Sequence, residues 1–138
     1  MLAGYSGKTL LDKLGIKTSM KILLIHPPGN YDALLGKDIS AQCCGQKEVP
    51  DFIHLFTRSL KEFYTATQKL QPVIASNPQI IIWVSWYKKS SKIPTDINED
   101  LIRAWALENG LVDIKVCAVS EEWSGLKLVV PLKKRKAR

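Results

Sequence analysis

The sequence predicts an α/β domain, and three observations support this class. Apolar residues make up 46% of the 138 residues, which is enough for a hydrophobic core. Three apolar runs, at residues 20–26, 51–56 and 79–86, are nearly continuous, as in strands that are buried on both faces. Segments with helical periodicity alternate with the later runs. Because parallel strands need a crossover connection, this alternation predicts a largely parallel sheet with helices on both faces.

The first elements follow from local signals. A short helix is expected over residues 6–14, with Ser6 or Thr9 as its cap and Gly15 at its end. The strand at 20–26 stops at two prolines, and residues 31–35 predict one helical turn. Residues 39–43 alternate only weakly and stand about seven residues before the next strand, which is too short for a helical crossover. They predict either an antiparallel edge strand or no strand.

The later elements predict the layers of the domain. Helices are expected from Ser59 to about residue 70 or 75, and from a cap at Thr95 or Asp96 to Asn109. Strands are expected at 112–119 and 126–132, joined by a turn at 121–125. Five residues can join antiparallel strands but cannot make a parallel crossover. The prediction is a single domain over residues 1–132, a Rossmann-like three-layer αβα sandwich. Its mostly parallel sheet of five or six strands closes with an antiparallel strand.

Charge is concentrated at the C-terminus. The net charge is +7, but residues 133–138 contain five basic residues and no acid, which leaves only +2 on the rest. We expect this segment to be a disordered basic tail. Nucleic acid is a possible partner through the tail, by way of Lys133, Lys134, Arg135, Lys136 and Arg138. The mild charge of the remainder does not predict a nucleic-acid footprint on the fold.

Several classes of protein are disfavoured by composition. Three cysteines without a framework favour a reducing compartment, and two histidines with no CxxC pair predict neither a metal site nor a cofactor. No apolar run approaches the roughly 18 residues of a membrane span, and the first residues do not resemble a secretory signal. We therefore expect a cytoplasmic protein with no membrane partner. Residues 4–9 end like a P-loop. A P-loop, however, has four residues between its first glycine and the Gly-Lys pair and follows a buried strand, whereas this segment has two and precedes the first strand.

A ligand site is expected where the parallel strands end, because open parallel sheets bind ligands beyond the carboxyl ends of their strands. Cations and helix N-termini there could hold a phosphate or carboxylate, and an indole could stack on a planar ring. The alternative is that these side chains serve only surface and packing roles. No catalytic group is assigned. The predicted rim comprises His26, Asn30, Arg58, Ser59, Ser85, Trp86, Lys88, Lys89 and Trp123.

The order of elements over roughly residues 20–132 resembles class I S-adenosylmethionine-dependent methyltransferases, which share a parallel sheet with a late reversed strand. That resemblance implies a trimmed relative. The glycine-rich loop of the family, which lies under the cofactor, is here replaced by Pro27, Pro28 and a lone Gly29. Proline removes a backbone donor and prevents the close approach that glycine permits. The resemblance therefore implies a fold without cofactor binding.

A second resemblance spans residues 4–130. The chain is similar to an uncharacterised bacterial family, domain of unknown function 3052. The segments that carry the similarity are residues 4–7, 13–16, 54–56, 83–86, 88–89, 94–96, 112–117 and 123–127. This resemblance implies a bacterial cytosolic protein and supplies no activity.

The sequence leaves three functions open. The first is a non-catalytic α/β domain that binds a small anionic or aromatic ligand, or a protein partner, at the carboxyl edge of the sheet. The second is a divergent transferase that binds S-adenosylmethionine or a nucleotide. The third is a nucleic-acid-associated protein that uses the tail. The ligand, the pathway and the oligomeric state are not predicted.

Overall fold

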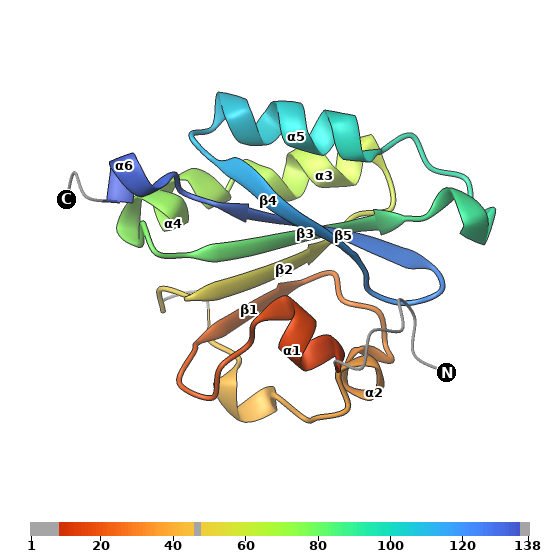
Figure 1. Ribbon diagram of the computed structural model, residues 1–138, viewed down its shortest axis with the longest axis horizontal. Coiled ribbons are helices and arrows are strands. Elements are labelled where there is room, and N and C mark those ends of the chain that lie inside the picture. The colour runs from red at the N-terminus through yellow and green to blue at the C-terminus, as the bar shows by residue number, and fades with distance from the viewer. Residues whose placement is uncertain (1–8, 46–47, 136–138) are drawn as a thin grey trace.

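A five-stranded mixed sheet organises the chain. The computed structural model describes residues 9–45 and 48–135. The strands are β1 (Ile22–Ile25), β2 (Phe52–Phe56), β3 (Ile81–Tyr87), β4 (Val112–Ala118) and β5 (Trp123–Val129), in the order β1-β2-β3-β5-β4 (Figure 1). The first three strands are parallel, as predicted, and β5 runs antiparallel to both β3 and β4.

The reversed strand was predicted to close the sheet, and this is wrong. β5 lies inside the sheet, between β3 and β4. Its side chains explain the position, because Leu126 and Leu128 are fully buried while β4 exposes Ile114 and Val116. A strand that is apolar on its inner positions belongs in the interior, and the half-exposed strand takes the edge.

Helices cover both faces of the sheet (Figure 1). The α3–α5 face packs against α3 (Leu60–Thr67), α4 (Leu70–Ser76) and α5 (Glu99–Glu108). The α1–α2 face packs against α1 (Leu10–Leu14) and α2 (Tyr31–Leu35). Along β1, Leu23 and Ile25 point to the α3–α5 face, whereas Ile22 and Leu24 point to the α1–α2 face.

The core of the α1–α2 face is built around Trp83. Its side chain is fully buried, and its indole N–H donates to the carbonyl of Leu14 at 2.9 Å, which ties α1 to the sheet. Gly125 lies in β5, opposite Ser85 of β3, and not in the predicted turn. A Cβ at Gly125 would meet Trp83 at 3.1 Å and Val119 at 3.0 Å. This glycine therefore serves close packing and not a tight turn.

The helix predicted from Ser59 to residue 70 or 75 is broken into α3 and α4. Pro72 lies in the first turn of α4, where its missing N–H costs nothing, but its ring would clash with the carbonyl of residue 68 in one continuous helix. Ser59 caps α3 as predicted, accepting from the N–H of Glu62. The predicted cap of α5 is wrong, because Asn98 accepts from the N–H of Leu101.

The weakly alternating segment at residues 39–43 contains no strand. Ser40–Gln42 form a 3₁₀ turn, and only Cys43 makes an isolated parallel bridge, to Ile22 of β1. The start of the predicted disordered tail is also different, because Leu132–Arg135 form the short helix α6, and residues 136–138 lie outside the described residues. Within the described chain, no helix has the length and apolar character of a membrane span.

Candidate functional site

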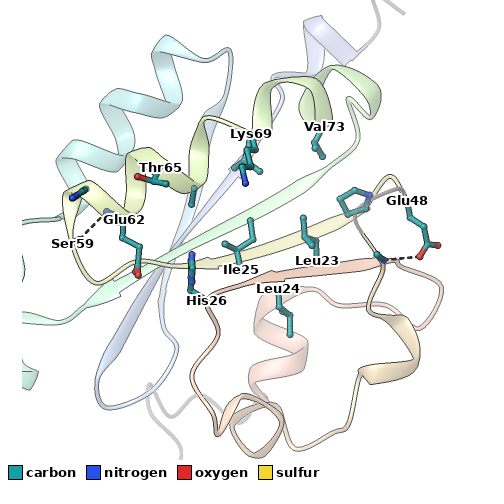
Figure 2. A pocket seen from close by; sticks show the side chains of 15 residues that line it. Leu23, Leu24, Ile25, His26, Glu48, Ser59, Glu62, Thr65, Lys69 and Val73 are labelled. Atoms are coloured by element: carbon teal, nitrogen blue, oxygen red, sulfur yellow. Dashed lines mark hydrogen bonds between the residues drawn. The ribbon is translucent and has the colours of Figure 1, made fainter.

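A groove of about 800 Å³ runs along β1 on the α3–α5 face (Figure 2). It lies between the first strand of the sheet and the helices that cover the neighbouring strands. Its lining comprises Leu23, Leu24, Ile25, His26, Gly45, Glu48, Pro50, Ser59, Lys61, Glu62, Thr65, Ala66, Lys69, Leu70 and Val73.

The floor of this β1 groove is apolar. Leu23 and Ile25 project toward α3 and α4, and Lys69 and Val73 face them from the helical side (Figure 2). Both β1 side chains are only half-buried, although they pack against the main core cluster. The reason is topological: β1 is the edge strand, and among the elements of residues 9–45 and 48–135 none continues the layer of α3 and α4 over it.

The polar end of the groove lies where β1 and β2 end. His26 has a φ of 54°, so the backbone turns sharply after Ile25 and ends the strand. Ser59 and Glu62 have structural duties here. The Ser59 hydroxyl accepts from the N–H of Glu62 at 3.1 Å, and the Glu62 carboxylate accepts from the N–H of Arg58 at 2.8 Å. This reciprocal arrangement resembles a capping box.

The uncompensated charge of the groove is positive. Glu62 pairs with the Arg58 guanidinium at 3.5 Å, and Glu48 pairs with Lys21 at 3.2 Å. Lys61 and Lys69 are exposed, and neither makes an ion pair with any residue in the described ranges. An occupant with carboxylates would therefore meet two free ammonium groups.

The predicted rim is divided by the structure into separate parts. His26 and Ser59 line the β1 groove, and Arg58 lies beside them, donating from its guanidinium to the His26 carbonyl at 3.4 Å. Asn30 is exposed before α2 and makes no side-chain capping bond. Ser85 is fully buried in the core.

Three further rim residues, Trp86, Lys88 and Lys89, line a second hollow of about 580 Å³ together with the start of α5. The first turn of α5 contributes Glu99 and Asp100. Their carboxylates share the single guanidinium of Arg103 with Asp113, so their negative charge is not fully compensated. Cations and anions are thus mixed in this hollow, and it does not select a purely anionic ligand.

Trp123, the remaining residue of the predicted rim, lies in the core cluster of the α1–α2 face and lines neither hollow. Its ring is buried, stacks on Tyr87 with centroids 4.3 Å apart, and meets the edge of Phe56 at 4.9 Å. The guanidinium of Arg58 lies over the ring, 5.4 Å from its centroid. The indole ring of Trp123 is therefore covered by other side chains of the protein, and it has no open face on which a planar ligand could stack.

A buried polar network lies on the α1–α2 face, away from the groove. The rings of Tyr31 and His54 are joined by a 2.8 Å hydrogen bond at Nδ1, and Nε2 of His54 bonds the Ser85 hydroxyl at 2.7 Å. Burial lowers the pKa of His54 to about 3. Burial also raises the pKa of the Tyr31 hydroxyl above its ordinary value. His54 is therefore neutral, with one ring nitrogen donating and the other accepting.

This network contains residue types that serve in acid–base catalysis, but it lies inside the core and has a structural role. His54 and Ser85 have no exposed surface, so no substrate reaches them in this structure. Within the described ranges no three histidine, cysteine, aspartate or glutamate side chains gather as metal ligands.

Apart from His26 and Ser59, the side chains that line the groove were not predicted as a site. The apolar run at residues 20–26 predicts burial on both faces, and no local signal marks β1 as the edge. On the helices, Thr65, Ala66, Lys69 and Val73 form a small and mixed stripe beside the buried one. That stripe is the signal that could have indicated a second, half-exposed face.

Comparison with solved structures shows two similar folds. An uncharacterised protein from Listeria monocytogenes has a TM-score of 0.55 and 9% identity, covering 92% of this chain and 69% of that one. A protein in the NADB-Rossmann superfamily from Streptococcus agalactiae has a TM-score of 0.50 and 9% identity, covering 91% and 69%. At this identity the likeness shows the fold alone.

No family model and no curated protein matches the chain, so the similarity to domain of unknown function 3052 stays a prediction. What the comparisons show is a mixed five-stranded α/β fold with helices on its sheet, similar to an uncharacterised protein and to one placed in the NADB-Rossmann superfamily.

Proposed function

We propose that this chain is a non-catalytic binding module that holds an apolar segment of a partner protein in the β1 groove. One observation carries the proposal: the groove of about 800 Å³ has an apolar floor of half-buried β1 side chains. The rim predicted from the sequence contributes its polar end, through His26 and Ser59.

Leu23, Ile25 and Val73 are incompletely buried in the free chain. Full burial of such a side chain is worth about 1.5–3 kcal/mol, and these three are only partly covered. A partner side chain in the groove would complete that burial. The gain is largest at the floor, where Leu23 and Ile25 lie beside each other on one face of the strand.

A small aromatic or anionic ligand fits the described residues less well. The guanidinium of Arg58 lies over the ring of Trp123, so these two side chains contact each other and not a ligand. The lysines of the second hollow lie beside two carboxylates. The polar side chains of the groove hold the start of α3 together and are not arranged as a nucleophile with a base.

A selection of displayed random short peptides tests this proposal. We expect peptides to be enriched on the wild-type chain. We expect Thr65→Trp, which puts a bulky uncharged side chain at an exposed position that lines the groove, to bind them at least about tenfold more weakly. Gln68→Trp, at the exposed C-cap of α3 but outside the groove, is the matched control. Equal binding by wild type and Thr65→Trp would remove the groove as the site.

A transferase that binds S-adenosylmethionine or a nucleotide is the second candidate. The late reversed strand β5 supports the likeness to class I methyltransferases, whereas the two prolines after β1 speak against the cofactor loop. A ligand at 100 times its dissociation constant adds about 2.7 kcal/mol to stability. A rise in melting temperature with S-adenosylmethionine, its demethylated product or a nucleotide would favour this candidate over the binding module.

Nucleic-acid binding through the tail is the third candidate. Lys133 and Lys134 are exposed in α6, where phosphates could reach them. The full chain and a chain ending at Leu132 should then differ in affinity for RNA, with a steep dependence on salt. Identical, salt-insensitive affinities would exclude the tail from this role.

A further inference from the structure

The β1 groove has an open backbone edge beside it. In a parallel ladder, the N–H and C=O groups of successive residues point alternately toward the two neighbouring strands. The carbonyl of Lys21 accepts from Phe52 of β2, whereas the carbonyl of Ile22 accepts from Cys44 on the outer side. The next outward-facing residue is therefore Leu24.

The outer edge of β1 is covered only at its beginning. Cys43 and Cys44 pair with Ile22, and the chain then leaves the strand. The outward N–H and C=O of Leu24 have no hydrogen-bond partner among the residues that the structure describes. An edge with unpaired backbone groups is a template for another extended chain.

The same edge opens into the groove. Leu24 lines the groove although its side chain points to the opposite face, away from Leu23 and Ile25 (Figure 2). The groove thus reaches the backbone of Leu24. A chain laid along β1 would place alternate side chains into the groove, next to Leu23 and Ile25, because strand side chains repeat every second residue.

On these grounds we infer that the occupant of the β1 groove is an extended, acidic partner segment that adds to the sheet as a strand beside β1. This inference rests on the proposed function and specifies its partner. Its apolar side chains fill the groove, and its backbone pairs with Leu24. Its carboxylates lie near Lys61 and Lys69, the two groove lysines without an ion pair in the described part of the chain.

Charge also selects among the possible occupants. A second copy of this chain would bring its own Lys61 and Lys69 toward the groove and add like charges. A basic amphipathic helix would meet the same two ammonium groups. An acidic strand is the occupant that both the open edge and the charge favour.

The peptides enriched on the wild-type chain provide the test. We expect them to alternate apolar and acidic residues. Methylation of the backbone nitrogen that would donate to the Leu24 carbonyl should weaken binding by about fivefold or more, because the blocked donor loses a hydrogen bond. The double variant Lys61→Glu with Lys69→Glu should bind at least about tenfold more weakly. A control of equal charge, Lys37→Glu with Lys133→Glu, changes exposed lysines outside the groove and should bind normally.

The failures of the two proposals are distinguishable. Enriched peptides that are blocked by Thr65→Trp, yet are helical, basic or insensitive to backbone methylation, would overturn the strand inference and leave the binding module standing. A dimer of the free chain that Thr65→Trp dissociates would identify a second copy as the occupant and overturn the inference. Enrichment of no peptide above the Thr65→Trp background would overturn both.

Discussion

The two faces of β1 are covered in different ways. On the α1–α2 face, Ile22 is fully buried, and Leu24 is half-buried but packs against the core cluster of that face. On the α3–α5 face, neither β1 side chain is fully buried, because Leu23 and Ile25 both line the groove. All four residues belong to one apolar run, so their own chemistry does not create the difference. The position of the helices does, and it leaves one face to stabilise the fold and the other free to bind.

The largest expected effect is on the closed face. Trp83→Ala removes a fully buried indole and the hydrogen bond to Leu14, and should cost about 3–5 kcal/mol of unfolding free energy in urea titrations. Val116→Ala, at an exposed position on the edge strand β4, should change it by less than about 0.5 kcal/mol. A small loss at Trp83 would mean that the closed face does not carry the stability.

His54 should make the closed face sensitive to acid. Its pKa is about 3 in the folded protein because of burial, whereas an unfolded chain has the ordinary value of 6.5. Below 6.5 the unfolded state takes up a proton that the folded state refuses, so stability falls as pH falls through that window. The slope should approach about 1.4 kcal/mol per pH unit. Urea titrations from neutral pH to pH 5 measure it, and His54→Gln should remove it. An unchanged slope in the variant would assign the pH dependence to other groups.

A smaller effect on stability is expected at the rim, where β2 and β3 end. Arg58→Ala removes a half-exposed ion pair with Glu62 and a cation–π contact with Trp123, which together are worth about 1 kcal/mol. Lys88→Ala removes no ion pair of the described chain, and should change the melting temperature hardly at all. Equal thermal stability of both variants would show that the contacts of Arg58 with Glu62 and Trp123 do not contribute to stability.

The smallest effect on stability is expected in the groove itself. Thr65→Trp and Gln68→Trp both change exposed positions, one within α3 and one at its C-cap, so each should alter the unfolding free energy by less than about 0.5 kcal/mol. Only Thr65→Trp should lose the selected peptides. If Thr65→Trp were instead strongly destabilised, the side chain of Thr65 would contribute to the core and this face would be closed.

The strands of the parallel part could be predicted from sequence because their signal is local. The runs at residues 20–26, 51–56 and 79–86 correspond to β1, β2 and β3 within about two residues. The hairpin was misplaced, since Gly125 reads as a turn residue and its real role, contact with Trp83, joins residues far apart in the sequence. The break before α4 was also missed, although Pro72 stood within the predicted helix.

The candidate site was less predictable because it depends on strand order. The sequence places His26, Arg58 and Ser59 at strand ends, and the structure brings these three together. It does not indicate that Ser85 and Trp123 point into the core, or that β1 ends the sheet. The apolar floor of the groove therefore reads as ordinary core until the neighbours of β1 are known.

Residue-resolved hydrogen exchange of the β1 amides tests the central claim most directly. In the free chain, the amides of Leu23 and Ile25 should be protected by β2, while the amide of Leu24, which faces outward, should exchange as an exposed group. A bound acidic peptide should protect Leu24 and leave its two neighbours unchanged. Equal protection of all three amides in the free chain would mean that the edge is already closed, and it would contradict the account.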